Sequence, residues 1–145
     1  MRTFLLLLYG TGALVGEVLS LKCCDIDFDL GLVQIRTWVA FRIREIPVGK
    51  DLLEIMRRYM AWRSRKKYSN PRLFVTKADE AIRSRNANKH FERIRRLAGV
   101  ARTDGEIQPR MLDLKYTFAV HRITSWIRNG ADLNRMLPAL AAYTG

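Results

Sequence analysis

The sequence predicts a mainly helical α+β fold with a small, three-stranded antiparallel sheet in its first half. Apolar residues recur at helical spacing through most of the second half, whereas residues 24–48 alternate polar and apolar side chains. The 145 residues, of which 48% are hydrophobic, contain no linker of low complexity. We therefore expect a single domain over residues 1–145 with one buried core.

Glycines and the alternation of polar and apolar residues mark the expected helices and strands of the first half. An apolar run near the start fits a buried helix, which Gly10 and Gly12 end. The last two strands are adjacent and antiparallel, and they join near Val39 and Ala40. The expected elements are helices over 4–9 and 13–21 and strands over 24–29, 32–38 and 41–48.

Capping residues and prolines mark the second half. Asp113 and Asp132 are expected to cap the last two helices, and Gly99 is expected to end the helix before them. Pro138 is expected to split the final helix into two short turns, and an apolar run after Pro71 predicts a short buried strand. The expected elements are helices over 51–69, 82–98, 114–128 and from 133 onward, and a strand over 73–75.

The charge balance indicates a polyanionic partner. Lys and Arg number 26 against 14 Asp and Glu, a formal net charge of +12 with a pI near 10.4. Nucleic acid is the usual partner of such a protein, and an acidic membrane surface is a rarer one. The densest basic groups, over 57–67 and 93–96, also fit a merely solvated helix face. No window approaches the ~18–20 apolar residues that a bilayer requires, so a membrane-spanning protein is not expected.

Cysteine and histidine usage predicts a cytoplasmic protein without a metal or cofactor. Cys23 and Cys24 are adjacent, and so tight a ring disfavours a disulfide between them. His90 and His121 lie far apart and outside any cluster with ligand spacing. The charged and apolar start of the chain resembles a short signal peptide, but the apolar run is brief and the chain lacks the cysteines of small secreted domains.

Segments spread along the chain resemble, in order, the catalytic domain of tyrosine recombinases, the phage-integrase family. Residues 9–21 (YGTGALVGEVLSL) resemble the opening of that domain, and residues 112–119 (LDLKYTFA) are similar to its signature box. The strands that lead to residues 46–48 look like the family's β-hairpin. The other matches are residues 25–28, 73–74, 95–100, 130–133 and 137–145. The resemblance implies the helical core of that domain with its small antiparallel sheet.

In that family, a tyrosine hydroxyl attacks a DNA backbone phosphate during strand exchange. Two arginines bind the phosphoryl oxygens, a hairpin lysine and a histidine transfer protons, and a further His or Trp assists. The arginines fit this task because fixed cationic donors meet the negative charge that develops, and the planar guanidinium gives two donors to one phosphate.

This sequence departs from the family at most of those positions. The first arginine falls on Leu14, the hairpin lysine at or near Val39, and the histidine of the signature box on Leu112. The second arginine falls on Lys115, and the position after it, often histidine, is Tyr116. An aliphatic side chain offers no hydrogen bond to a phosphate, and loss of one preorganised donor typically costs about 100- to 1000-fold in rate.

The resemblance also predicts what the chain lacks. The sequence ends at Gly145, where the family places its His or Trp and, several residues later, its nucleophilic tyrosine. Tyr143 precedes that point and is not expected to be the nucleophile. The expectation is one catalytic-like domain without the amino-terminal DNA-clamping domain and without the tyrosine segment. Glu17, Asp113 and Thr117 match the family and are expected to serve the scaffold.

These observations predict a DNA-binding domain that neither cleaves nor joins DNA. Binding is expected to be weak, sensitive to salt and directed at the backbone of double-stranded DNA. One alternative is a protein-interaction module, or a self-associating one, whose groove for a terminal helix is unfilled; another is an active fragment that takes its tyrosine from a second chain. The expected DNA-binding residues are Arg42, Arg44, Arg83, Arg85, Lys89, Arg110 and Lys115.

Overall fold

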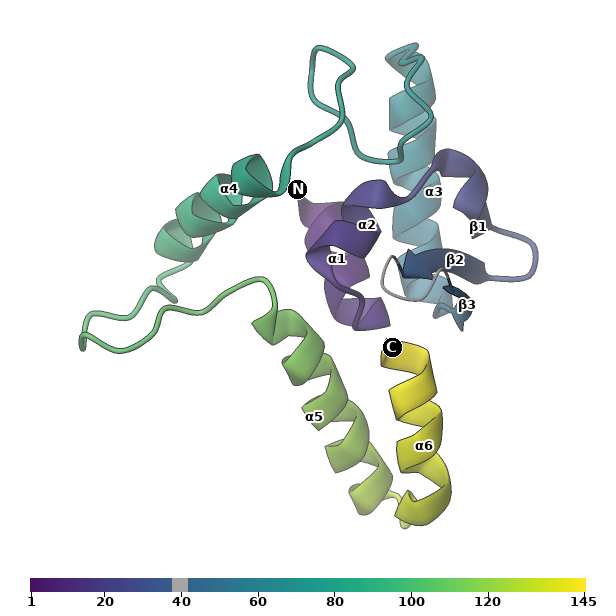
Figure 1. The fold of residues 1–145 in the computed structure, drawn as a ribbon, viewed down its shortest axis with the longest axis vertical. Coiled ribbons are helices and arrows are strands. Elements are labelled where there is room, and N and C mark those ends of the chain that lie inside the picture. Colours follow the sequence, from purple (N-terminus) through teal and green to yellow (C-terminus); the bar gives the residue numbers. More distant parts are fainter. Residues whose placement is uncertain (38–41) are drawn as a thin grey trace.

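The chain is described here from a computed structural model that covers residues 1–37 and 42–145 (Figure 1). The mainly helical fold with a three-stranded antiparallel sheet is confirmed. No helix of the described ranges is long and apolar enough to cross a membrane. The elements are α1 (Arg2–Thr11), α2 (Val15–Ser20), the 3-10 turn η1 (Cys23–Asp25), β1 (Ile26–Asp27), β2 (Leu32–Thr37), β3 (Arg42–Pro47), α3 (Lys50–Arg65), α4 (Ser84–Leu97), α5 (Asp113–Arg128) and α6 (Leu133–Thr144).

The sheet has the order β1-β2-β3, and its register decides which side chains are buried. Ile46 pairs with Val33, and Arg44 pairs with Ile35. Directly paired residues share a face, and alternate residues return to it, so Arg44 lies on the same face as the fully buried Ile35 and Ile46. Ile43 lies on the other face and is 59% exposed. The expected junction at Val39 and Ala40 falls outside the described residues.

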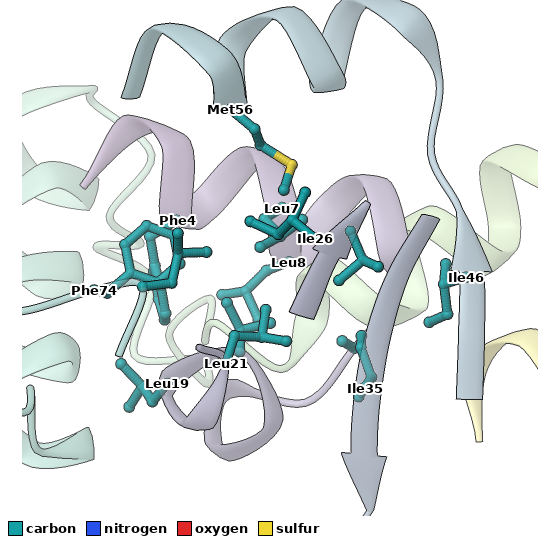
Figure 2. Packing of buried hydrophobic residues seen from close by; sticks show 14 of the residues in the cluster. Phe4, Leu7, Leu8, Leu19, Leu21, Ile26, Ile35, Ile46, Met56 and Phe74 are labelled. Carbon is teal, nitrogen blue, oxygen red and sulfur yellow. The ribbon is translucent and has the colours of Figure 1, made fainter. Parts of the chain in front are cut away.

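Helix α1 is the centre of the core (Figure 2). Its buried Phe4 meets Phe74 edge to face, with ring centroids 5.3 Å apart, and Leu7 lies beside Met56 of α3. The core also takes buried residues from α2, from the sheet and from the segment after α3; these include Val18, Leu19, Leu21, Val33, Ile35, Ile46 and Leu73.

The first two helices differ in length from the prediction. The expected break at Gly10 is wrong, because α1 continues to Thr11, whose hydroxyl donates to the Leu7 carbonyl at 2.6 Å. Gly12 ends the helix with φ 60°, a conformation that glycine adopts without strain. The second helix is shorter than expected, since Leu14 is its N-cap and the helix begins at Val15.

The predicted strand over 73–75 is wrong. The segment after α3 pairs only through isolated bridges, Lys22 with Arg72 and Val75 with Ala81. An apolar run that is buried by packing on α1 does not require a ladder, and Pro71 removes one donor from this stretch.

The last two helices pack against each other and project from the core (Figure 1). Asp132 caps α6 as predicted, since its carboxylate accepts the Asn134 amide at 2.9 Å. Asp113 is instead the first residue of α5, and its carboxylate accepts the Arg110 amide at 2.7 Å. The expected split at Pro138 is wrong, because α6 is one helix with Pro138 inside it. One proline removes a single backbone donor, and the bonds on either side can keep the helix continuous.

Candidate nucleic-acid interface

A buried carboxylate gathers hydrogen-bond donors at the start of α2, and we call this side-chain cluster around Glu17 the pocket. Glu17 is 4% exposed, and its Oε2 accepts the Leu14 amide at 2.8 Å. The same carboxylate accepts the Thr37 hydroxyl at 2.8 Å and the Arg44 guanidinium at 3.0 and 3.1 Å. The spacing of residues 14 and 17 is that of a capping box, so the sequence explains the first of these bonds.

Arg44 brings a guanidinium into this pocket. Its side chain is 14% exposed, and Nη2 reaches both oxygens of Glu17. Its Nε is buried and has no hydrogen-bond partner among the described residues. The pocket that the resemblance left without an arginine therefore holds one, supplied by β3. The sequence predicted Arg44 as a DNA contact, and the register of the sheet places its side chain on the inner face, beside Glu17.

Lys115 lies on the other side of the same pocket. From α5 its ammonium donates to the carbonyls of Thr144 at 2.9 Å and Gly145 at 3.2 Å. Burial lowers the pKa of Lys115, the Glu17 carboxylate opposes that shift, and the Arg44 guanidinium adds to it. Lys115 thus shares an electrostatic environment with Arg44 and Glu17. We call Arg44 and Lys115 the pocket cations.

The other positions that the resemblance singles out carry no charge. Leu14 is 41% exposed and gives only its backbone amide to the pocket. Leu112 is half-buried and lines, with Val15 and Arg110, a cavity of about 410 Å³ between α4 and the start of α5. Tyr116 is 56% exposed, and Val39 lies outside the described residues.

Tyr143 is held away from any reacting group. Its hydroxyl donates to the carbonyls of Pro47 at 3.0 Å and Gly10 at 3.3 Å, and its ring stacks on Phe118 with centroids 5.5 Å apart. Burial raises the pKa of Tyr143. A neutral phenol that donates to backbone carbonyls is a poor nucleophile.

The remaining expected DNA-binding residues are exposed but lie on separate elements. Arg42 begins β3, and Arg110 precedes α5 and donates to Asp113 at 3.3 Å. The other three lie at the start of α4, which stands apart from α5 and α6 in Figure 1: Arg83, Arg85 and Lys89. The structure thus brings together Arg44 and Lys115, and it leaves the α4 cations as a second basic surface.

Sequence reasoning missed the partnership of Glu17 with Arg44. The two residues are 27 positions apart, and each was interpreted separately, one as scaffold and one as a DNA contact. The signal was the inner-face position of Arg44, two residues before the buried Ile46. The sequence analysis did not assign a buried face to this strand, and the apolar Ile43 on its other face is exposed.

The fold is that of a recombinase catalytic domain. Residues 1–135 match the model of the phage integrase family, and the chain belongs to that family. A putative integrase/recombinase, y4rB, of Sinorhizobium fredii is 26% identical over 142 residues, which are 96% of this chain and 45% of that protein.

Solved structures agree on the fold. The crystal structure of XerA recombinase superposes with a TM-score of 0.80 at 22% identity, covering 100% of this chain and 48% of that one. XerH site-specific recombinase bound to palindromic difH substrate, a post-cleavage complex, superposes with a TM-score of 0.74 at 20% identity. The match covers 99% of this chain and 38% of that one. The chain therefore spans about half the length or less of these relatives.

Proposed function

We propose that this chain is a DNA-binding domain of the tyrosine-recombinase type that does not itself cleave or join DNA. The observation that carries the proposal is the convergence of Arg44 and Lys115 around Glu17 on a recombinase fold, in a chain with a net charge of +12. The related XerH is solved with its DNA substrate, which supports double-stranded DNA as the ligand class.

Binding is proposed to be directed at the DNA backbone. Cations that reach phosphates release counterions, and they do so without reading bases. The pocket cations would hold one phosphate, while Arg42, Arg110 and the three cations at the start of α4 would contact others. Free thiols at Cys23 and Cys24 fit a cytoplasmic protein, where such DNA is found.

The proposal of no cleavage follows from the chemistry of the described residues. Arg44 already pairs with Glu17, so part of its charge is compensated before a phosphate arrives. Lys115 keeps a charge but lacks the bidentate fork. Tyr143 donates to carbonyls, and Tyr116, one residue after Lys115, points about 100° away from it around the helix. Neither of these phenols is aimed at the pocket cations.

Binding is tested by titrating a fluorescent duplex of random sequence at salt concentrations between about 50 and 200 mM. The expected result is a dissociation constant that rises steeply with salt and differs little between sequences. Affinity that is insensitive to salt would contradict backbone-directed binding.

Cleavage is tested on supercoiled plasmid and on a duplex with a suicide nick, followed by denaturing electrophoresis. The expected result is no nicked circle and no covalent adduct. An adduct that Tyr116→Phe abolishes would overturn the proposal. An adduct that forms only after a catalytically active relative is added would instead support the alternative in which a second chain supplies the tyrosine.

The exposed apolar surface of α5 and α6 favours one further candidate, an interaction with protein. Val120, Ile127 and Leu137 are 58%, 59% and 43% exposed on these two helices. A contiguous exposed apolar patch is typical of contact surfaces. Sedimentation velocity over a range of concentrations tests self-association; a protein that stays monomeric and binds DNA speaks for the DNA-binding function alone.

A further inference from the structure

A second cationic cavity lies beside the pocket of Glu17, at the other end of α2. It has a volume of about 500 Å³ and is enclosed by α2, the strands β2 and β3, and the segment after α3. Its described lining contains four cations and no carboxylate; the cations are Lys22, Arg36, Arg42 and Arg72. Ser20 and Thr37 also line the cavity, but their hydroxyls already donate to Glu17, that of Ser20 to its carbonyl at 2.7 Å and that of Thr37 to its carboxylate at 2.8 Å.

Two of these cations face each other directly. Lys22 and Arg72 form an antiparallel bridge, and residues directly opposite in such a bridge project to the same side. Like charges in that arrangement repel each other and destabilise the pairing. Among the described residues, Lys22 forms no ion pair that could offset the repulsion.

The nearby carboxylate is already fully engaged. Asp25 is 2% exposed; one oxygen accepts Arg36 at 2.6 Å and the other accepts the Lys22 amide at 2.8 Å. These bonds fix Arg36 at the cavity, but they give the Lys22 ammonium no partner. Arg72 is fixed in turn, since its Nη1 donates to the Leu19 carbonyl at 2.9 Å.

We infer that this cavity binds a phosphate group. Two guanidinium groups held by the protein and an ammonium opposite one of them match the donors that the oxygens of a phosphate group accept. A bound phosphate relieves the repulsion between Lys22 and Arg72. The six residues of α2, about 9 Å of helix, separate this cavity from Leu14. The inference deepens the proposed function, because the natural source is a backbone phosphate of the same DNA; free phosphate is the other source.

Lys22→Gln tests the inference, because the backbone amide and carbonyl of Lys22 bond with Asp25, whereas its ammonium has no hydrogen bond or ion pair within the described part of the chain. Lys66→Gln removes the same charge from an exposed lysine at the end of α3 and is the matched control. In the DNA titration, Lys22→Gln is expected to weaken binding several-fold and to reduce the slope of log affinity against log salt by about 1. Lys66→Gln is expected to change neither.

Inorganic phosphate, at constant ionic strength, separates the two sources. Amide resonances of Ser20, Arg36 and Arg72 are expected to shift saturably in the unmodified chain and much less in Lys22→Gln. If phosphate binds there and the chain does not bind DNA, the inference holds for free phosphate and the proposed function fails.

The inference itself fails under two results. Equal losses of DNA affinity in Lys22→Gln and Lys66→Gln would show only a general effect of the protein's net charge. DNA binding that Lys22→Gln leaves unchanged, together with no phosphate-induced shifts at the cavity, would retain the proposed function and overturn the second site.

Discussion

Two arginines are withdrawn from solvent in regions that use them differently. At the end of α3, Arg63 is 7% exposed and donates to backbone carbonyls, among them that of Arg72 at 2.9 Å and that of Leu73 at 3.3 Å. In the pocket of α2, Arg44 donates to the buried Glu17 and has a buried Nε without a described partner.

The difference separates an arginine held by neutral carbonyls from one held by a buried carboxylate. Neutral carbonyls around Arg63, including that of Asn70, connect α3 to the segment that follows it. Its charge is therefore dispersed among neutral backbone groups. Arg44 instead keeps hydrogen-bond donors beyond its ion pair, beside a second cation, Lys115. Burial alone does not distinguish these roles; the chemistry of the acceptors does.

The largest expected effect in this comparison comes from Arg63→Met. The change leaves several carbonyls without their charged donor, and hydrogen bonds to charged groups contribute about 1.5–3 kcal/mol each. We expect the free energy of unfolding to fall by about 3 kcal/mol in urea denaturation. Arg65→Met, on an exposed position of the same helix, should change it little. DNA affinity per folded molecule should be the same in both variants, and a specific loss of affinity in Arg63→Met would break the distinction.

Glu17→Gln is expected to have opposite effects on stability and on binding. The amide keeps an acceptor for the Leu14 amide but no longer compensates the charge of Arg44, so the free energy of unfolding should fall by about 2 kcal/mol. DNA affinity should rise several-fold, because Arg44 then meets a phosphate uncompensated. Glu54 forms an exposed ion pair with Arg58, so Glu54→Gln should change neither the free energy of unfolding nor the DNA affinity. A loss of both stability and affinity would show that Arg44 serves the fold in the way that Arg63 does.

The same contrast explains what the sequence could predict. Helix and strand periodicity was sufficient for the order of elements and for the sheet, and family positions were sufficient to find Leu14 and Lys115. The pairing of Arg44 with Glu17 depends on which face of β3 is buried, and an apolar residue on each face, Ile43 and Ile46, left that choice ambiguous.

Errors in the fold had equally local causes. Leu73 and Phe74 have the composition of a strand, but they are buried by packing on α1 and by the hydrogen bonds of Arg63. The hydrophobic periodicity of the sequence shows neither of these contacts. Pro138 was expected to break the last helix, but the residues on both sides of it remain helical. The cavity at Lys22 was missed because its four cations come from distant segments.

Lys115→Met is expected to have a smaller effect, confined to DNA binding. It removes one of the pocket cations while its stem keeps the packing, so the salt slope should decrease by about 1 and the affinity a few-fold. Lys115→Arg should retain the slope. If Lys115→Met binds as the unmodified chain does, the carbonyls of Thr144 and Gly145 are the only partners of this ammonium, and the pocket has one effective cation.

The smallest effect at neutral pH is expected from Tyr59→Phe, which tests the Arg63 region independently. The Tyr59 hydroxyl donates to the Leu73 carbonyl at 3.0 Å, the same oxygen that Arg63 approaches, and loss of this bond should lower the free energy of unfolding by about 1 kcal/mol.

Burial raises the pKa of Tyr59 to about 12, whereas an unfolded tyrosine titrates near about 10. The stabilising effect of the neutral phenol is fully present below about pH 10 and is lost as the pH rises toward 12, because the unfolded chain releases its proton first. Urea denaturation at alkaline pH should therefore show a shallower loss of stability in Tyr59→Phe than in the unmodified chain. Tyr116→Phe, whose hydroxyl is exposed, should leave stability at neutral pH unchanged. An equally steep alkaline loss in Tyr59→Phe would mean that this phenol is hydrated, and that Arg63 alone holds the carbonyls after α3.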